Sequence, residues 1–238
     1  MAKTKGSDAA QAPRFEGFAD TEMAFFHALD ATQDRAWFQE HKQEFERGWA
    51  APMEALLGEV RERLGKEYKG LELRPPKVFR LQRDVRFSLD KTPYKTAVSG
   101  ILALKGHGGA TETPAALYLQ LGLETFGGAG LYGMAGDTLD RFRAAVIDNR
   151  SGGALVKACA QVEALGFGFE AMETLKTAPR GVDKDHPRIA FLKRKGLVTV
   201  FPPVPVASIA SRAFVDWVYA RAVETAPVVR WLAQHTTG

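Results

Sequence analysis

Apolar residues recur at helical spacing along the first quarter of the chain. The stretch DTEMAFFHALDA, residues 20–31, places its apolar side chains on one helical face, and Asp20 stands in front as a capping residue. A second apolar stripe begins after Asp34 and has Pro52 inside it. Because proline lacks an amide hydrogen, it kinks or divides a helix. The pattern therefore predicts two helices, the second interrupted near Pro52.

The period of the pattern changes from helical to alternating after two consecutive prolines at residues 75–76. Residues 77–82, KVFRLQ, alternate as a strand does. Three further stretches also predict strands, at residues 97–104, 116–122 and 125–133. We expect the last two to form a hairpin whose second strand is loosened by its glycines.

Two helices follow the predicted hairpin. Residues 135–149 form the first, with Asp137 or Thr138 as its cap, and residues 151–166 form the second, which Gly166 ends.

The last part of the chain predicts a short helix, a strand and a long helix. Residues 187–194 begin with Pro187 in the first turn of the short helix, and LVTVF at residues 197–201 is the strand. The long helix starts near Ser208, with a break at Pro227.

The order of these elements indicates the fold class. Strands gather in the middle of the chain and helices flank them, which fits an α+β domain with a central, mostly antiparallel sheet better than alternating βαβ units. We expect residues 1–13 to be a disordered lead and residues 14–238 to form a single domain.

Composition narrows the setting. The chain has 238 residues, 45% hydrophobic and 25% charged, which is ordinary for a globular protein. We find neither an apolar run of about 18 residues, the length of a membrane span, nor the apolar core of a secretory signal. The single cysteine, Cys159, cannot form an internal disulfide and lies in a helical pattern as a small buried residue. We therefore expect a cytoplasmic protein with no membrane partner.

Positive charge is concentrated in two segments. Residues 74–95 contain seven basic residues against two aspartates, and residues 176–195 repeat that balance. Each segment therefore carries +5, and the rest of the chain carries −6 within an overall charge of +4. Positive charge concentrated in two segments indicates a surface that binds an anion, whereas positive charge spread over the whole protein would not.

The first basic segment, KVFRLQRDVRFSLDKTPYKT, predicts an ordered anion-binding loop. Arginine forks suit carboxylates and phosphates, while hydroxyl groups add neutral donors. With one arginine of the second segment, the expected ligand-binding residues are Arg80, Arg83, Arg86, Lys91, Tyr94, Lys95 and Arg180. The alternative is that Asp84 and Asp90 pair with these arginines in a structural network, in which exposed pairs contribute about 0–1 kcal/mol each.

The second basic segment contains the candidate acid–base residues. Histidine is the common general acid–base residue of proteins, and Asp185 precedes His186, so the two are the expected catalytic residues. The alternative is that Asp185 caps the helix that begins at Pro187. The histidine spacing matches no zinc motif, so no metal site is expected and the sequence indicates no cofactor.

Several motifs in order resemble one known family. FEGF at residues 15–18, DRAWFQEHKQEFE at 34–46 and VFRLQRDVRFSLDKTPYKT at 78–96 resemble segments of the DUF2461 family, as do YLQL…GGAGLY and LKTAPRGVDKDHPRIAFLKRKGLV farther along. The resemblance covers about residues 15–220, and Gln33 departs from it where asparagine is expected. It implies a shared fold and a shared site but no activity.

Three functions compete at this level. The first is a site for a phosphorylated or carboxylated small molecule, built from both basic segments in one pocket. The second is a module that binds nucleic acid or another polyanion, which a sequence pI near 9.2 permits. The third is a structural or protein-interaction domain. The residues do not decide between an enzyme and a binding protein.

Overall fold

A computed structural model describes residues 14–86, 88–106, 109 and 111–237. The predicted disordered lead, residues 1–13, lies outside the described residues. Across the part that is described, no helix is both long enough and apolar enough to cross a bilayer.

The first two helices begin where the sequence pattern places them. Helix α1 spans Ala24–Thr32, and the carboxylate of Asp20 accepts hydrogen bonds from the amides of Ala24 and Phe25 at 2.9 and 3.0 Å. Helix α2 spans Arg35–Phe45, and Asp34 caps it by accepting from two amides of its first turn. The predicted role of Asp20 is borne out by its bonds to these amides, although Met23 holds the N-cap position of α1, and the predicted start of the second helix near Asp34 is confirmed. Both carboxylates satisfy amides that a helix leaves unpaired at its start.

The predicted interruption near Pro52 is a change of helical winding. A π-helical turn, η1 (Glu46–Ala50), joins α2 to helix α3 (Ala51–Leu64), and Pro52 is the second residue of α3. The amide of the second residue of a helix has no carbonyl partner within that helix. Proline at this position therefore costs α3 no hydrogen bond, and α3 continues undisturbed after it.

A six-stranded antiparallel sheet forms the centre of the molecule and confirms the α+β class. Its strands lie in the order β1-β2-β3-β4-β6-β5. Their bounds are β1 (Lys77–Val78), β2 (Ala97–Ala103), β3 (Ala115–Gly122), β4 (Phe126–Leu131), β5 (Gly168–Glu170) and β6 (Leu197–Val200). The β3–β4 hairpin is as predicted, whereas β5 is an additional strand and β1 is much shorter than predicted.

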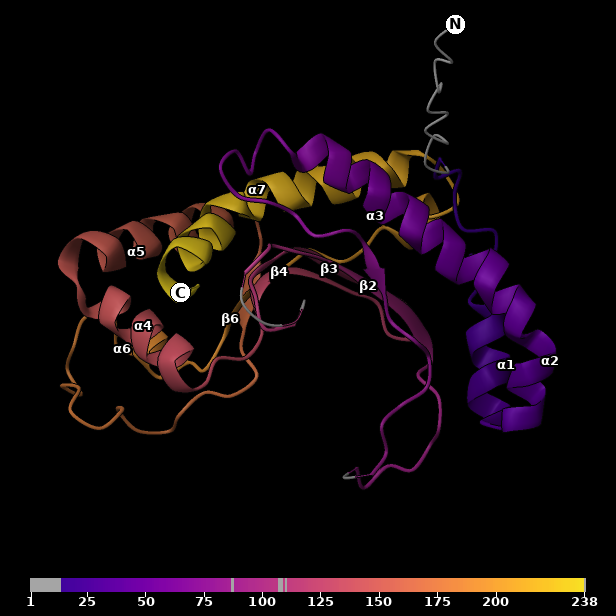
Figure 1. The fold of residues 1–238 in the computed structure, drawn as a ribbon, viewed down its shortest axis with the longest axis horizontal. Helices are drawn as coiled ribbons and strands as arrows, with labels where there is room; N and C mark the ends of the chain where they lie inside the picture. The colour runs from indigo at the N-terminus through magenta and orange to yellow at the C-terminus, as the bar shows by residue number, and fades with distance from the viewer. Residues whose placement is uncertain (1–13, 87, 107–108, 110, 238) are drawn as a thin grey trace, which may run out of the picture.

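The sheet is arched, and its two faces differ. Helix α3 and the long C-terminal helix lie over the convex face (Figure 1). Gly100 of β2 makes this contact close, because a Cβ there would lie 2.5 Å from a methyl carbon of Leu57. A smaller apolar cluster, Ile101, Ala103 and Ala115, lies apart from the main core. In Figure 1, no labelled helix lies over the concave face of the sheet.

Three helices pack beside β4 and β6 at one end of the sheet (Figure 1). They are α4 (Gly136–Ile147), α5 (Asn149–Glu163) and α6 (Ile189–Leu192). The predicted cap of α4 is wrong, since Ala135 is its N-cap and no side chain bonds there. Asp148 caps α5 instead. Helix α6 is a single turn because the backbone before it is occupied by tight turns.

Helix α7 (Ala213–Thr236) follows a 3-10 turn, η2 (Val206–Ser208), and contradicts the predicted break at Pro227. The helix is continuous through the proline, which is exposed. Ala226, Val228 and Val229 on either side of it are buried. Their burial in the core outweighs the roughly 3 kcal/mol that an interior proline costs a helix.

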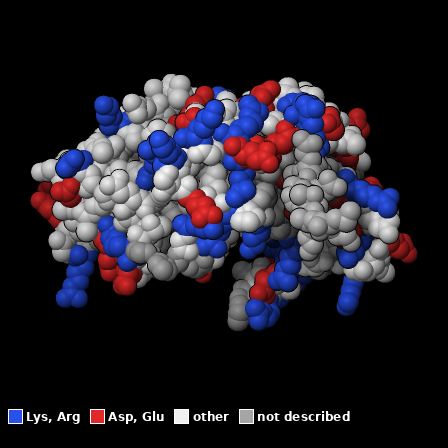
Figure 2. Space-filling model, turned by 45° about the horizontal axis from the view of Figure 1, so that its top comes forward, with Lys and Arg blue, Asp and Glu red and all other residues white. Residues whose placement is uncertain are grey.

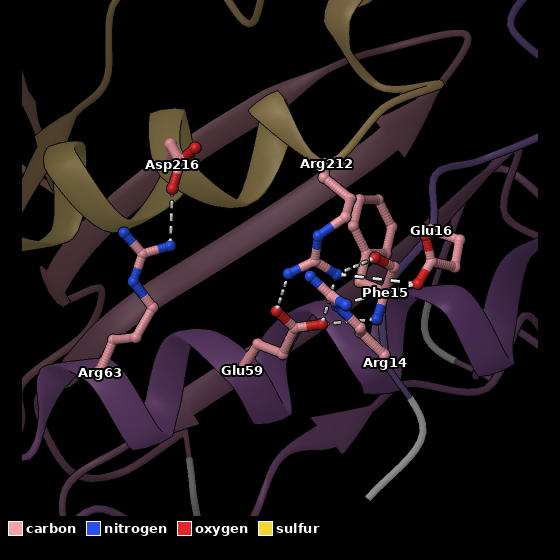
Figure 3. Close-up of polar contacts among 7 residues, drawn as sticks. All are labelled: Arg14, Phe15, Glu16, Glu59, Arg63, Arg212 and Asp216. Atoms are coloured by element: carbon pink, nitrogen blue, oxygen red, sulfur yellow. Dashed lines mark hydrogen bonds and ion pairs between the residues drawn. The ribbon is translucent and has the colours of Figure 1, made fainter.

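A polar cluster joins α3, α7 and the segment that precedes α1 (Figure 3). Arg212 donates to Glu59 at 2.8 Å and to the carbonyl of Phe15 at 2.6 Å, while the Phe15 amide donates to Glu59 at 2.6 Å. A second pair, Arg63 and Asp216, joins the same helices at 2.8 Å in a more exposed position. These contacts hold the buried ring of Phe15 in place.

Candidate functional site

The first basic segment forms a loop that extends from the β1 edge of the sheet, away from the helices (Figure 1). We call residues 80–95 the basic loop. The Phe79 amide still bonds to Ser99 of β2, but beyond it the chain pairs with its own return arm. The amide of Lys95 donates to Leu81 at 2.9 Å, and that of Arg83 to Pro93 at 2.8 Å. The strand predicted to reach residue 82 therefore ends at Val78.

The base of the basic loop is fixed to the N-terminal helices. Gln33 accepts a hydrogen bond from the Tyr94 amide at 3.1 Å and donates to the Tyr94 carbonyl at 3.3 Å. The Tyr94 ring is buried against Phe38, with the ring centroids 4.6 Å apart. Tyr94, a predicted ligand-binding residue, thus packs in the core and anchors the loop.

Most charges of the basic loop pair within it. Arg86 donates to both oxygens of Asp84, at 2.9 and 2.6 Å, and these bonds lower the pKa of Asp84. Arg83 pairs with Asp90, whose pKa falls to about 2, first because the Thr92 amide donates to it and then because Arg83 does. For these two arginines the geometry is that of the structural network named as the alternative.

Lys91 also serves the loop. Its ammonium group donates to the carbonyl of Val85 at 2.9 Å. Such a bond to a backbone carbonyl closes the loop across its two arms.

Two lysines beside the Phe79 ring, and Arg80 next to Phe79 in the chain, are placed differently. The ammonium groups of Lys77 and Lys95 lie 5.1 and 5.6 Å from the centre of the Phe79 ring, within reach of its π face. Burial, and then the charges of Arg80 and Arg83, lower the pKa of Lys95. We call Lys77, Arg80 and Lys95 the Phe79 cations. Within the described ranges, no carboxylate lies within 4.0 Å of their charged groups.

A cavity of about 630 Å³ lies on the side of the sheet that carries Ile101 and Tyr118, and Phe79 is part of its wall. We call it the concave cavity. Strand register explains its floor, because Ile101, Tyr118, Gly128 and Val200 are successive cross-strand partners from β2 to β6. Residues in such a row project to the same face of a sheet. Lys77 is the partner of Ile101 on β1, so the row ends at one of the Phe79 cations.

Aromatic rings and glycines make the floor apolar. Tyr118 lies between Phe79 and Phe126, with centroid distances of 6.2 and 6.0 Å, and all three rings are half-buried. Beside them, Gly128 and Gly130 of β4 add no side chain of their own, and Val198 of β6 packs closely against Gly128.

The walls of the concave cavity come from segments beyond the strand ends. Tyr132 and Met172 are 60% and 55% exposed, which is unusual for such large apolar side chains and leaves them open to a ligand. Glu170 lines the cavity at the β5 edge, opposite the Phe79 cations. Among the described residues that line the cavity, it is the one carboxylate.

The second basic segment is mainly structural. Arg188 donates to the carbonyls of Val146 and Ile147 at 2.6 and 2.8 Å, and so satisfies the C-terminal end of α4. Lys195 pairs with Glu173 at 2.8 Å. Arg180 is exposed and, like the other cations of this segment, does not line the concave cavity.

The candidate acid–base residues lie in the turns before α6. His186 Nδ1 accepts a hydrogen bond from the Arg188 amide at 3.0 Å, so this nitrogen carries no proton in that arrangement. Asp185 is exposed, and its Oδ2 lies 3.7 Å from the Nζ of Lys184. No side chain caps α6, so the interpretation of Asp185 as its cap is wrong. Neither residue lines the concave cavity, and their catalytic role stays a prediction.

The structure does not bring the two basic segments into one pocket. In Figure 1 the basic loop extends from the β1 edge, whereas the segment before α6 lies beneath α4 and α6 at the other end of the sheet. Figure 2, an oblique view of the helix-covered side, shows acidic and basic side chains interspersed there. The site is therefore built from the first segment and the sheet.

Metal ligands and reactive thiols are not gathered at the site. Among the residues that the structure describes, no group of three or more His, Cys, Asp or Glu side chains could hold a metal ion. Cys159 is buried in α5, and burial raises its pKa to about 12, so its thiol stays protonated.

Sequence reasoning missed the cavity floor. The signal was alternation in ALYLQLG and TFGGAGLYG, which places Tyr118 on one face and Phe126 and Gly128 together on one face of the next strand. Alternation does not say which face helices will cover, so these residues could not be assigned to an open site.

Three comparisons with known proteins complete the description. The model of a family described as "Conserved hypothetical protein (DUF2461)" matches residues 21–231. Comparisons with curated proteins and with solved structures gave no match.

Proposed function

The chain belongs to the DUF2461 family, and from its site we propose that it binds an anionic ligand, phosphorylated or carboxylated, whose apolar part enters the concave cavity. One observation carries the proposal: an apolar, aromatic cavity whose lining ring Phe79 is flanked by Lys77 and Lys95, for which the described residues provide no carboxylate partner within 4.0 Å. Its volume of about 630 Å³ falls within the roughly 300–1,000 Å³ of ligand pockets in proteins.

The apolar floor selects the body of the ligand. Phe79, Tyr118 and Phe126 offer ring surface that water covers in the free protein. Burying apolar area releases about 25 cal/mol per Å², so a flat, apolar group is favoured over a fully hydrated one.

The Phe79 cations select the charge. Lys95 is partly desolvated and close to the charges of Arg80 and Arg83, which is why the pKa of Lys95 is lowered. An anion beside Lys95 would offset both effects, because it adds an attractive charge in a region of reduced dielectric. The proposed binding residues are therefore Lys77, Arg80 and Lys95, supported by a loop that Arg83, Arg86 and Lys91 hold in shape.

A matched pair of fluorescent probes tests the proposal. 1-Anilinonaphthalene-8-sulfonate and N-phenyl-1-naphthylamine share an aromatic body, and only the first is an anion. We expect the sulfonate to bind the folded protein more tightly than the uncharged probe. The measurement is a fluorescence titration of each probe, with circular dichroism to show that the protein is folded.

Variants separate the two parts of the site. Lys95→Gln should weaken sulfonate binding roughly tenfold, equivalent to about 1.4 kcal/mol, and leave the uncharged probe unchanged. Tyr118→Ala should weaken both probes. Lys184→Gln, which removes a cation from an 84% exposed side chain away from the cavity, is the control. Equal sulfonate binding by Lys95→Gln and the wild type would contradict the proposal.

A further inference from the structure

We infer that the ligand of the concave cavity is single-stranded nucleic acid, whose bases stack on Phe79, Tyr118 and Phe126 while its phosphates lie along the Phe79 cations. This inference rests on the proposed function, and it names the anion and the apolar part that the site accepts.

The spacing of the rings is the first argument. Their centroids are 6.2 and 6.0 Å apart, well above the roughly 3.4 Å between stacked bases along one strand of a duplex. A strand on this floor would therefore have its bases separated from one another, with one base for each ring. Sheets that bind single strands use two or three aromatic side chains in this manner.

The openness of β4 is the second argument. Gly128 is the cross-strand partner of Tyr118 and lies two residues after Phe126, so it separates the two rings without a side chain of its own. A purine or pyrimidine is a rigid plate and needs a clear surface beside the ring on which it stacks. A Cβ at residue 128 would lie 3.0 Å from Val198 Cγ1 and 3.1 Å from Cε1 of the Phe126 ring, so a side chain there would press on that ring.

The distribution of charge is the third argument, and it favours a chain of phosphates over one small anion. Positive side chains continue beyond the Phe79 cations along the β1 edge. Arg74, Lys77 and Lys105 line a second cleft of about 620 Å³, and Lys77 belongs to both groups. Lys105 pairs with Glu72 and so adds little net charge, and Arg74 donates to the carbonyls of Leu104 and Gly106. Lys77 is therefore the cation of this cleft that we expect to contact a phosphate. A single carboxylate or phosphate uses one such group, whereas a strand passes several.

The carboxylate of Glu170, on the β5 side of the cavity, is the fourth argument. Glu170 can only accept hydrogen bonds when ionised, so a ligand that reaches it must donate. The amino groups of adenine, cytosine and guanine are such donors. A fatty acyl chain would leave this carboxylate without a partner and would desolvate it, which is costly.

The size of the site sets the expected length of the bound strand. The three rings stand on the β1 side, β3 and β4, about three strand spacings of roughly 4.8 Å from end to end. One nucleotide covers one ring, so binding should strengthen with strand length up to about three or four nucleotides. A duplex keeps its bases inside and cannot place them on the rings.

The test is fluorescence anisotropy with fluorescein-labelled single strands of six nucleotides, dC and dT, at low salt. Unlabelled one-, three- and six-nucleotide strands and a 20-base-pair duplex serve as competitors. We expect the six-nucleotide dC strand to bind most tightly, the mononucleotide to compete at least 100-fold less well and the duplex at least tenfold less well per site. Affinity should fall with salt by a log–log slope of about −0.7 for each phosphate contacted.

Two variants and a matched control locate the contact. Tyr118→Leu and Phe79→Leu should each weaken single-strand binding about tenfold while thermal melting shows a folded protein. Tyr219→Leu is the control, since Tyr219 lies on α7 beneath Arg63, on the helix-covered side. Glu170→Gln should reduce the preference for dC over dT.

The outcomes separate this inference from the proposed function. If the sulfonate probe binds in the cavity and no strand does, the inference is wrong and the proposed function stands. A mononucleotide that competes as well as the six-nucleotide strand would also overturn the inference in favour of a free small ligand. Equal binding of duplex and single strand, or no effect of Tyr118→Leu, would reduce the interaction to general charge attraction. Failure of both the probe and the strands would overturn both proposals.

Discussion

Gly152, at the corner between α4 and α5, shows how tightly single positions are determined. A Cβ on this residue would lie 2.2 Å from the carbonyl oxygen of Val146 and 2.7 Å from the Nε of Arg188. The same carbonyl accepts the hydrogen bond from Arg188 that completes α4. The absence of a side chain thus allows three segments to meet. At the adjacent Gly153, an added Cβ would meet no atom within 4 Å.

These two glycines give a matched prediction. Gly152→Ala should lower the free energy of unfolding by more than about 2 kcal/mol, because both obstructing groups are held in place. Gly153→Ala should raise it by roughly 0.5–1 kcal/mol, since alanine is the better helix former. Urea denaturation of both variants is the measurement. A Gly152→Ala protein as stable as the wild type would show that the corner can relax.

Single residues also mark the limit of what the sequence can predict about the site. Lys95 was named as a binding residue, and its ammonium group lies 5.6 Å from the centre of the Phe79 ring, which lines the cavity. Arg80 was named with it, and its charge contributes, after burial, to the lowered pKa of Lys95 and, after the hydrogen bonds from Arg86, to that of Asp84. Arg83 and Arg86 were named with equal reason, yet both pair with aspartates of their own loop. Arginines and aspartates that alternate in a loop fit either arrangement, because the choice depends on the turn that brings particular side chains together.

At the scale of elements, α7 offers a direct test of tertiary packing against local preference. The amide that Pro227 lacks would have bonded to the carbonyl of Val223 one turn earlier. The helix nevertheless continues for nine more residues, to Thr236. The proline ring is exposed, so its removal opens no space in the core.

Pro227→Ala should therefore stabilise the protein by about 1–2 kcal/mol, because it restores a helical hydrogen bond. Alanine also makes the unfolded chain more flexible, which offsets part of this gain. The shift in the midpoint of urea unfolding measures this. Ala220→Pro, about two turns earlier in the same helix, should by contrast be strongly destabilising. A Pro227→Ala protein that melts earlier than the wild type would mean that the ring itself supports the packing of α7.

Elements were predictable where pattern and packing agree. The long strands and the first two helices follow from alternation and helical spacing. The basic loop was read as a strand to residue 82 because alternation persists there, although its amides bond to the return arm of the loop. The three residues of β5 were missed because such a short segment carries no period, and its pairing with β6 comes from distant parts of the chain.

For the whole molecule, the cluster around Glu59 links three parts of the chain and makes their association depend on pH. Arg212 is the main cause of the lowered pKa of Glu59, and the Phe15 amide adds to it. A carboxyl group whose pKa is lower in the folded state stabilises that state above its unfolded pKa, and this stabilisation is lost as the pH falls through the folded value.

Glu59→Gln should accordingly lower Tm near neutral pH by about 2–4 °C, the shift expected from roughly 1 kcal/mol in a chain of this size. The difference from the wild type should shrink as the pH falls below about 4, where the wild-type carboxyl group also becomes protonated. Differential scanning calorimetry between pH 3 and 7 is the measurement. Asp216→Asn, in the more exposed pair of the same two helices, should change Tm little. A Glu59→Gln deficit that is constant over this range would exclude the charge as its cause.

The open side of the sheet is a property of the whole molecule and could not be read from local pattern. Whether Tyr118 faces solvent or a helix depends on where α3 and α7 come to rest, and these helices precede and follow the sheet in the chain. The cavity is the side that they leave uncovered.

That uncovered side has a further consequence for how the protein avoids self-association. A sheet can template foreign strands at its margins, where backbone groups lack partners. The outermost strands here have two and three residues, and the longest ones are enclosed between neighbours. An intruding chain would find too short a ladder to hold, so this protein can display an aromatic surface without offering a seed for fibril-like growth.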